Sequence, residues 1–398
     1  MTDDVHSAPA RRRGLPTVPE SSLIASVLLS FLATAGLFYV NIMAALVDGL
    51  ISGAGLSAKQ AGLVASANVY GAALGALTAV FIIRRLPWRP TAVTVLLGLI
   101  AIDLISTLVT GPELLIAVRF AHGLIGGLLV GVAFAVIART KTPDRTFGML
   151  LVVQFGLGGL GLMFLPRLVP VFGPGVLFVA LAAFSLATLA MVPFLGAYTA
   201  ARKVVTDGAK PPPVWIPLGL VFTAIFLFQA ANMGLAAYII GLGKAAGLPL
   251  KFITDTLGAA NWIGALGSVI VVVMGVRLGR FWPIVAGLAL TLAGTWGFHF
   301  SHLPWVYLIA NIGTAITWAF VIPYLLGMSA AFDKAGQMAA LAGFFSKMGL
   351  ASGPALAAFV AAGGQYDGLI NLSVLGLALS GFAAAAPALL LDRQRPSG

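Results

Sequence analysis

Residues 196–213, GAYTAARKVVTDGAKPPP, divide the chain into two halves of similar length. The stretch ends in three consecutive prolines and contains no apolar run, which is typical of a linker. Six apolar runs lie on either side, each long enough for a helix that crosses a bilayer. The runs are approximately 22–48, 58–83, 91–110, 113–138, 146–168 and 174–195, then 214–240, 252–275, 282–300, 305–329, 338–362 and 368–391.

This pattern predicts an all-α integral membrane protein with 12 transmembrane helices in two six-helix bundles. We expect the bundles at 22–195 and 214–391, with a linker at 196–213 and tails at 1–21 and 392–398. The first tail contains Arg11, Arg12 and Arg13 and no apolar run, so we do not expect it to be a cleavable signal peptide.

The composition supports a membrane protein. Apolar residues make up 60% of the chain and charged residues only 9%, whereas about a quarter of the residues in an average soluble protein are charged. A soluble enzyme and a disordered chain are therefore both disfavoured. The absence of cysteine excludes disulfides, thiolate nucleophiles and cysteine-based metal sites.

The net charge of +11 would suggest nucleic-acid binding in a soluble protein, but here it follows the membrane topology. Of the 23 Lys and Arg residues, 17 lie in tails, linker and loops on one side of the predicted membrane, and four lie on the other. The positive-inside rule makes the first side cytoplasmic. We expect a multi-pass protein of the cell membrane (a bacterial inner membrane) with both termini in the cytoplasm.

The two halves are similar in sequence. Ala67–Ala72 matches Ala260–Ala265 at an offset of 193 residues, and at the same offset Gln154 aligns with Lys347. Each half has six spans, so the repeats run parallel and predict two pseudo-symmetric bundles related by an axis along the membrane normal.

Several motifs resemble those of the major facilitator superfamily. The stretch Gly55–Leu63, GLSAKQAGL, is similar to the superfamily's opening of the second helix. Arg119 and Gly123 resemble its Arg-x-x-x-Gly motif on the fourth helix. Together with the arrangement of two six-span halves around a cytoplasmic linker, the resemblance covers residues 22–391.

Two basic loops carry a further part of the resemblance. Arg85 and Arg89 keep two positions of the superfamily's signature between helices 2 and 3, and the second half keeps its Arg-x-Gly-Arg as Arg277 to Arg280. The acidic residue of the signature is missing from both copies. The resemblance implies that these four arginines take part in gating.

The resemblance also implies a secondary transporter. Its halves would rock around a central cavity lined by helices 1, 4, 7 and 10, with help from helices 2, 5, 8 and 11. Helix 5 lacks the Gly-Pro motif of the drug antiporters, and this argues against a drug/proton antiporter.

Two basic residues lie inside apolar runs, where an ionisable group costs at least about 2.5–3.5 kcal/mol. Arg119 is near the start of run 113–138, and Lys347 is about ten residues into run 338–362, near the bilayer midplane. Two positive charges beside an apolar cavity favour an anionic substrate. The alternatives are an ion pair of Arg119 with Asp103 or Asp48, and snorkelling of Lys347.

Three titratable residues are candidates for proton coupling. Asp48 ends the first run, Asp103 lies within the third, and His122 is three residues after Arg119 on nearly the same helix face. Carboxyl and imidazole groups in such positions can carry a coupling proton. The alternatives are ion pairs with Arg119 for the acids and a neutral, hydrogen-bonded packing role for the histidine.

Neutral polar and aromatic residues complete the predicted substrate site. An amide in the bilayer interior needs a hydrogen-bond partner, which is either a substrate or a neighbouring helix. A tryptophan there shapes a cavity, faces lipid or packs between helices. Besides Arg119 and Lys347, the predicted substrate-binding residues are Gln154, Gln229, Asn232, Asn41, Asn261, Trp262 and Trp318.

Other motifs do not indicate chemistry. Gly156–Gly161 fits G-x-G-x-x-G, but it lies within an apolar run and no strand precedes it. His299 and His302 have a ligand-like spacing without an evident third ligand. With no Walker sequence either, we predict no metal, no cofactor and no enzyme activity.

The sequence therefore predicts a secondary active transporter that moves a small organic anion, such as a carboxylate, by alternating access coupled to protons. The alternative is a multidrug or lipid exporter of the same fold, a proton antiporter, which an unpaired Asp48 or Asp103 would favour. The duplicated halves and buried charges argue against a receptor or scaffold. The expected partners are the substrate, the proton and the lipid bilayer, without nucleic acid, and a monomer is expected.

Overall fold

The computed structural model describes residues 17–82, 86–198, 214–332, 337–361 and 364–394, and within these ranges the chain is helical without strands. The first half contains α1 (Leu23–Ala35), α2 (Phe38–Asn41), α3 (Met43–Ser52), α4 (Ala58–Ile82), α5 (Trp88–Ser106), α6 (Pro112–Ile137), α7 (Pro143–Phe172), α8 (Gly175–Met191) and the 3₁₀ turn η1 (Val192–Phe194). The second contains α9 (Trp215–Ala245), α10 (Leu250–Met274), α11 (Phe281–Gly297), the 3₁₀ turn η2 (Phe298–Phe300), α12 (Pro304–Ala331), α13 (Gln337–Val360) and α14 (Asp367–Arg393). Each predicted run coincides with helix to within a few residues at its ends, and the all-α prediction is confirmed.

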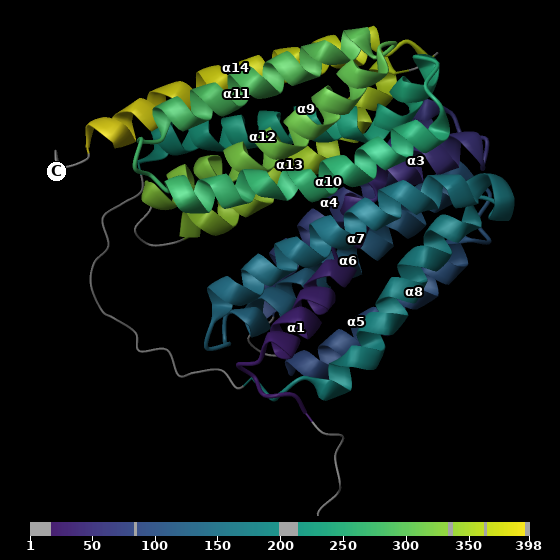
Figure 1. The fold of residues 1–398 in the computed structure, drawn as a ribbon. Helices are drawn as coiled ribbons and strands as arrows, with labels where there is room; N and C mark the ends of the chain where they lie inside the picture. The colour runs from purple at the N-terminus through teal and green to yellow at the C-terminus, as the bar shows by residue number, and fades with distance from the viewer. Residues whose placement is uncertain (1–16, 83–85, 199–213, 333–336, 362–363, 395–398) are drawn as a thin grey trace, which may run out of the picture.

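The helices form two bundles, α1 to α8 and α9 to α14 (Figure 1). In the first bundle α4 packs on α6, α5 on α8, and α1 on α7. The equivalent pairs of the second bundle are in contact as well: α10 with α12, α11 with α14, and α9 with α13. The two halves thus repeat one packing pattern in one chain direction, as expected for a parallel duplication.

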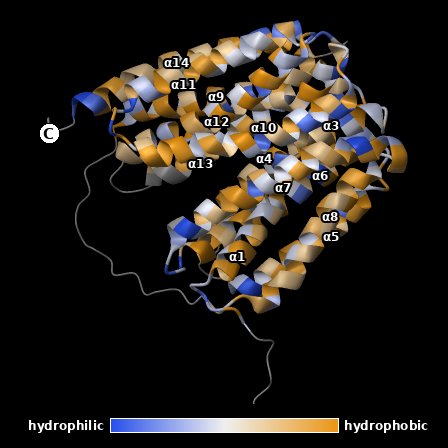
Figure 2. Ribbon diagram, in the orientation of Figure 1, coloured by the Kyte–Doolittle hydropathy of each residue, from blue (hydrophilic) through white to orange (hydrophobic). Residues whose placement is uncertain are grey.

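Hydrophobic residues predominate along the helices of both bundles (Figure 2), and many of them lie at the surface. Ten of the described helices are long and apolar enough to cross a membrane, and α1 and α3 are shorter apolar helices. Large side chains such as Phe81, Val272 and Phe382 are exposed on this surface. In water they would form unfavourable patches, whereas in a bilayer they face lipid.

The first span differs from the expectation of one helix over 22–48. It is broken into α1, α2 and α3 by turns at Gly36–Leu37 and at Ile42. At the first break the chain lies against α6, where a Cβ on Gly36 would lie 2.3 Å from the carbonyl oxygen of Gly126. The break places Leu37, Val40 and Asn41 at the boundary between the two bundles.

Glycines allow α4 and α6 to approach closely. A Cβ on Gly71 would lie 2.2 Å from the carbonyl oxygen of Phe120, and a Cβ on Gly123 would lie 1.8 Å from that of Asn68. Both distances are far below van der Waals contact, so a larger residue would force the helices apart. This close packing brings Asn68 of α4 beside the polar residues of α6.

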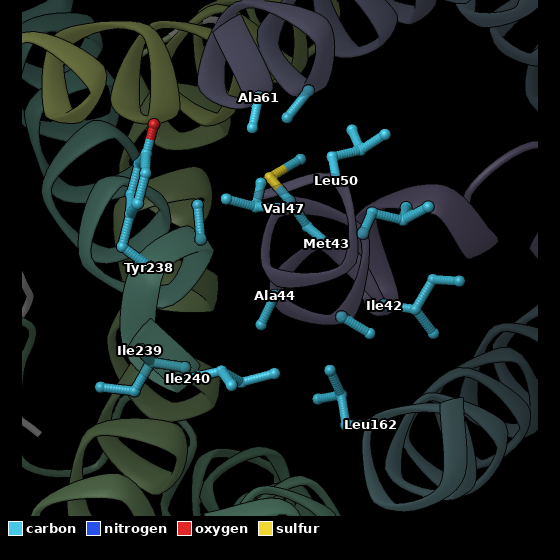
Figure 3. Packing of buried hydrophobic residues seen from close by; sticks show 14 of the residues in the cluster. Ile42, Met43, Ala44, Val47, Leu50, Ala61, Leu162, Tyr238, Ile239 and Ile240 are labelled. Atoms are coloured by element: carbon cyan, nitrogen blue, oxygen red, sulfur yellow. The ribbon is translucent and has the colours of Figure 1, made fainter. Parts of the chain in front are cut away.

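Among the described residues, the buried apolar contacts between the bundles concentrate toward one end of the molecule. We call the end where α8 ends and α9 begins the linker end, and the opposite end the distal end. Toward the distal end one buried apolar cluster spans both bundles and includes Met43, Val47, Leu162, Tyr238 and Ile240 (Figure 3).

Toward the linker end each bundle has its own core. Leu96 and Val132 belong to the core of the first bundle, and Leu218 and Met328 belong to that of the second. The helices of the two bundles diverge in this direction (Figure 1).

Candidate functional site

A cavity of about 320 Å³ lies between the two bundles. It is lined by the broken first span, α4 and α7 on one side and by α9 to α13 on the other. The polar members of the lining are Asn41, Asn68, Gln154, Asn232, Asn261, Thr295, Asn311, Thr314, Trp318 and Lys347. The rest of the lining is apolar, for example Leu151, Phe155 and Met233.

Lys347 carries the only charge among the described residues that line this cavity. Its helix α13 is held against α9 through Gly349, where a Cβ would lie 2.4 Å from the carbonyl oxygen of Phe226. Residues two apart on a helix point in nearly opposite directions, so Lys347 extends away from α9. Within the described part of the chain its ammonium group has no hydrogen bond or ion pair.

Four predicted amides meet Lys347 at this cavity: Asn41, Gln154, Asn232 and Asn261. Asn41 Nδ2 donates to the backbone oxygen of Gln154 at 3.4 Å, and Asn232 Nδ2 donates to that of Phe228 at 2.8 Å. The side chains of Gln154 and Asn261 have no hydrogen bond to any other described residue. The cavity wall therefore carries hydrogen-bonding groups that the protein leaves unpaired.

Trp318 also lines the cavity, and two successive hydrogen bonds hold its ring in place. Its Nε1 donates to Gln229 Oε1 at 2.8 Å, and Gln229 Nε2 donates to Ser346 Oγ at 2.8 Å. Gln229 does not itself line the cavity, so it positions Trp318 from behind. Across the cavity, Phe155 contacts Trp318 edge to face with ring centroids 6.4 Å apart.

Trp262 lies elsewhere. Its side chain is exposed, and its Nε1 donates to the backbone oxygen of Gly156 at 3.1 Å, which joins α10 to α7. Gly159 leaves room for the ring, since a Cβ there would lie 2.4 Å from Trp262 Nε1. The predicted substrate contact is therefore a contact between bundles in this structure.

Arg119 does not line the cavity, and neither does any other described residue of α6. Its guanidinium is fully buried and donates to Asp103 Oδ1 at 2.7 Å and to Ser106 Oγ at 3.2 Å, both on α5. It also lies over the rings of Tyr39 and Phe178, 4.9 and 5.1 Å from their centroids. This is the ion pair that the sequence offered as the alternative to substrate binding.

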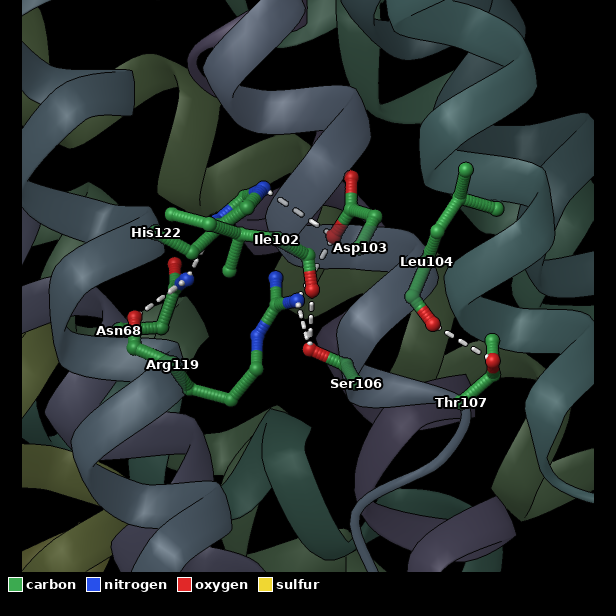
Figure 4. Close-up of polar contacts among 8 residues, drawn as sticks. All are labelled: Asn68, Ile102, Asp103, Leu104, Ser106, Thr107, Arg119 and His122. Carbon is green, nitrogen blue, oxygen red and sulfur yellow. Dashed lines mark hydrogen bonds and ion pairs between the residues drawn. The ribbon is translucent and has the colours of Figure 1, made fainter.

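The predicted coupling residues Asp103 and His122 belong to the same network (Figure 4). Asn68 Nδ2 donates to the backbone oxygen of Arg119 at 3.1 Å and lies 2.8 Å from His122 Nδ1. Nδ1 must then accept, which leaves the proton on Nε2, 3.2 Å from Asp103 Oδ1. Since Asn68 also lines the cavity, Asn68 and His122 together connect the cavity to the buried acid.

Asp48 is far from this network and pairs with Lys244, a partner the sequence did not indicate. Lys244 Nζ lies 2.6 and 2.8 Å from the two Asp48 carboxylate oxygens and joins α3 to α9 at the distal end. A second distal ion pair joins Arg167 of α7 to Asp255 of α10, whose other oxygen accepts from Lys251 at 2.8 Å.

Further hydrogen bonds join the bundles from their middle to the distal end. Tyr238 Oη donates to the backbone oxygen of Ala58 at 2.8 Å, and the hydroxyls of Tyr70 and Ser352 lie 2.7 Å apart. These hydrogen bonds and ion pairs between described residues of the two bundles thus lie from the middle of the helices to the distal end. The contacts therefore close the cavity on the distal side.

The predicted gating arginines lie at the linker end, except that Arg85 is outside the described residues. Arg89 donates to the backbone oxygens of Leu195 and, at 3.1 Å, Gly196, which holds the start of α5 to the end of its own bundle. Arg277 is exposed.

The backbone N–H of Arg280 donates to both Asp392 oxygens, at 2.8 and 2.9 Å. The basic loop of the second half thus receives a carboxylate from α14, although its own acidic position is missing.

The cavity residues that sequence reasoning left out of the predicted site include Phe155, Asn311 and Thr314. A helical signal was present for two of them, because Asn311, Thr314 and Trp318 are spaced three and four apart and share one face of α12. Phe155 has no such signal, since nothing in a run of apolar residues indicates which one faces the other bundle.

Two duplicated membrane bundles around a central polar cavity define a multi-pass membrane transporter. The family model described as Major Facilitator Superfamily matches residues 23–358, and the chain belongs to this family. Among solved structures, the nucleoside transporter NupG, crystallised as a point mutant, is similar with a TM-score of 0.69 and 13% sequence identity, covering 92% of this chain and 99% of that one. A comparison with curated proteins finds no match.

Proposed function

We propose that the protein transports a small organic anion, with Lys347 binding the anionic group. The observation that carries this proposal is an unpaired ammonium that is the only charge among the described lining residues. A carboxylate beside it would gain a charge-assisted hydrogen bond in a site of low dielectric. Arg119 stays a candidate in the wider site, but its pairing with Asp103 favours an indirect role.

We place the protein in the inner membrane of a bacterium, as a monomer with its linker end toward the cytoplasm, because the basic residues concentrate there. In that orientation the structure corresponds to a state open to the cytoplasm. Transport then requires the Asp48–Lys244 and Arg167–Asp255 pairs to break while the linker ends come together, with Arg85, Arg89, Arg277 and Arg280 at that gate.

Proton coupling is proposed at Asp103 and His122. One oxygen of Asp103 accepts from Arg119 and His122, whereas Oδ2 is buried and has no hydrogen-bond donor among the described residues. That oxygen is a position for a proton, and Asn68 connects the pair to the cavity. Asp48 is the second candidate, because a proton on its carboxylate would weaken the bond to Lys244.

Two other substrate classes compete with an anion. A cationic drug would need an acid in the cavity, and none lines it among the described residues. An uncharged nucleoside, the kind of substrate for which the transporter NupG is named, would suit the amides and Trp318 but gives Lys347 no partner. We therefore rank the anion first.

The test is a thermal-shift comparison of carboxylates, cationic drugs and nucleosides on the purified protein. We expect carboxylates to stabilise the wild type, and Lys347→Gln to weaken their binding about 10- to 100-fold, the range for a charge-assisted hydrogen bond. Lys141→Gln, at an exposed loop lysine, is the matched control. Stabilisation by drugs or nucleosides but by no carboxylate would exclude the proposal.

A further inference from the structure

The amides of the cavity are oriented by the backbone. Asn232 Nδ2 donates to the backbone oxygen of Phe228, and Asn311 Nδ2 donates to that of Tyr307, both at 2.8 Å and both one turn back along their own helix. Asn41 makes the corresponding bond across to α7. Because a backbone carbonyl only accepts, the amide nitrogen is fixed on it in each case, and the side-chain oxygen Oδ1 remains.

These three oxygens have no hydrogen-bond donor among the described residues. Gln154 and Asn261 add two amides whose side chains are unpaired at both atoms. Asn41 and Asn261 are neighbours, since one Cβ placed on Gly158 would lie 3.2 Å from Asn41 Cβ and 3.5 Å from Asn261 Oδ1. The wall of the cavity is therefore rich in acceptors and has one cation.

Acceptors of this kind impose a requirement on the substrate. While the cavity is open to water, water can donate to them, but a substrate that fills a cavity of about 320 Å³ displaces that water. An acceptor left without a donor in a closed site costs about 1–3 kcal/mol. The bound substrate must therefore carry several hydrogen-bond donors as well as its anionic group.

We propose that the substrate is a hydroxylated monocarboxylate, with its carboxylate on Lys347 and its hydroxyl groups donating to Asn41, Asn232 and Asn311. This rests on the proposed function, because it takes the anion from Lys347. A second carboxylate would find no second cation among the described lining residues, so the cavity favours a monoanion over a dianion. An alkyl carboxylate of the same length would leave the three oxygens unpaired.

The test compares three six-carbon compounds on the full-length wild-type protein: gluconate, hexanoate and sorbitol, by calorimetric binding and thermal shift. We expect gluconate to bind at least tenfold more tightly than either of the others. Equal binding of hexanoate would overturn the hydroxyl requirement and leave the anion proposal standing. Binding of sorbitol without binding of either carboxylate would overturn both, and no binding of gluconate would overturn the inference.

Variants then assign the effect to the amides. Asn232→Leu and Asn311→Leu remove one acceptor each, and each should weaken gluconate binding about three- to tenfold, which is the range for one hydrogen bond. Neither variant should weaken hexanoate binding, because hexanoate leaves that acceptor unpaired in the wild type. Asn371→Leu, at an exposed asparagine outside the cavity, is the matched control. The comparison of compounds on the wild type needs no variant, so it still decides the inference if a leucine variant fails to fold.

Discussion

The ion pair between Asp48 and Lys244 should set the balance between the two states of the transporter. It joins α3 of one bundle to α9 of the other at the distal end, so it exists only while that end is closed. Asp48→Asn removes the charge with little change in shape. We expect this variant to populate the state in which the linker ends approach each other.

The size of the effect follows from the exposure of the two side chains. That of Asp48 is 9% exposed and that of Lys244 is 37% exposed. An exposed pair contributes about 0–1 kcal/mol and breaking a buried one costs about 3–5 kcal/mol, so this half-solvated pair should contribute about 1–2 kcal/mol. The ratio of the two states should then change about 5- to 30-fold.

Spin-label distances measure this ratio. The chain has no cysteine, so Gly148→Cys and Gly343→Cys give two unique labelling sites near the linker ends of α7 and α13. A Cβ at either position has no heavy atom of another residue within 4 Å, so a label should be tolerated. The wild type should show mainly the longer separation, and Asp48→Asn should add a shorter one.

The matched control is Glu113→Gln, which removes an exposed carboxylate at the distal end that has no partner among the described residues. The charge swap Asp48→Lys with Lys244→Asp should restore the wild-type distribution. An unchanged distribution in Asp48→Asn, or the same change in Glu113→Gln, would refute the assignment of this pair as a distal lock.

Two stability predictions concern the first bundle. Gly123→Leu places a Cβ 1.8 Å from the backbone oxygen of Asn68. It should lower the thermal midpoint by an amount equivalent to about 1–3 kcal/mol, or prevent folding. The control Gly111→Ala, in open space, should have little effect on the thermal midpoint. Asp103→Asn leaves the buried Arg119 without its charge partner and should lower the free energy of unfolding by about 3–5 kcal/mol. The double variant with Arg119→Met should recover part of that stability in the same melting experiment. No recovery would argue against a buried ion pair.

Much of the fold could be predicted because bilayer thickness fixes the length of a span. The run at 58–83 corresponds to α4 (Ala58–Ile82), and the run at 305–329 to α12 (Pro304–Ala331). The breaks in the first span could not be predicted in this way. At the first of them Gly36 lies against Gly126, ninety residues further along the chain, and no local pattern indicates that contact.

The site was predictable in part. Lys347 and four amides stood out because polar groups in apolar runs are few, and they meet at one cavity. The rotation of α6 toward α5 decides which group the Arg119 side chain contacts. The sequence did not decide whether that group is a substrate or an acid such as Asp103, and the structure shows Asp103. The partner of Asp48 lies 196 residues away in the other half, and no local pattern indicates such a pair.

The interrupted first span has a mechanical consequence. Its first piece, α1, packs on α6, α7 and α8 of its own bundle, whereas its last piece, α3, contacts α9 of the other bundle as well as α4, α7 and α8 of its own. A continuous helix would have to bend or lose these contacts when the bundles rotate against each other. A span already divided at Gly36–Leu37 and Ile42 can bend at these turns while its helical pieces stay intact. Asn41, one of the residues of this span that line the cavity, lies next to the second turn.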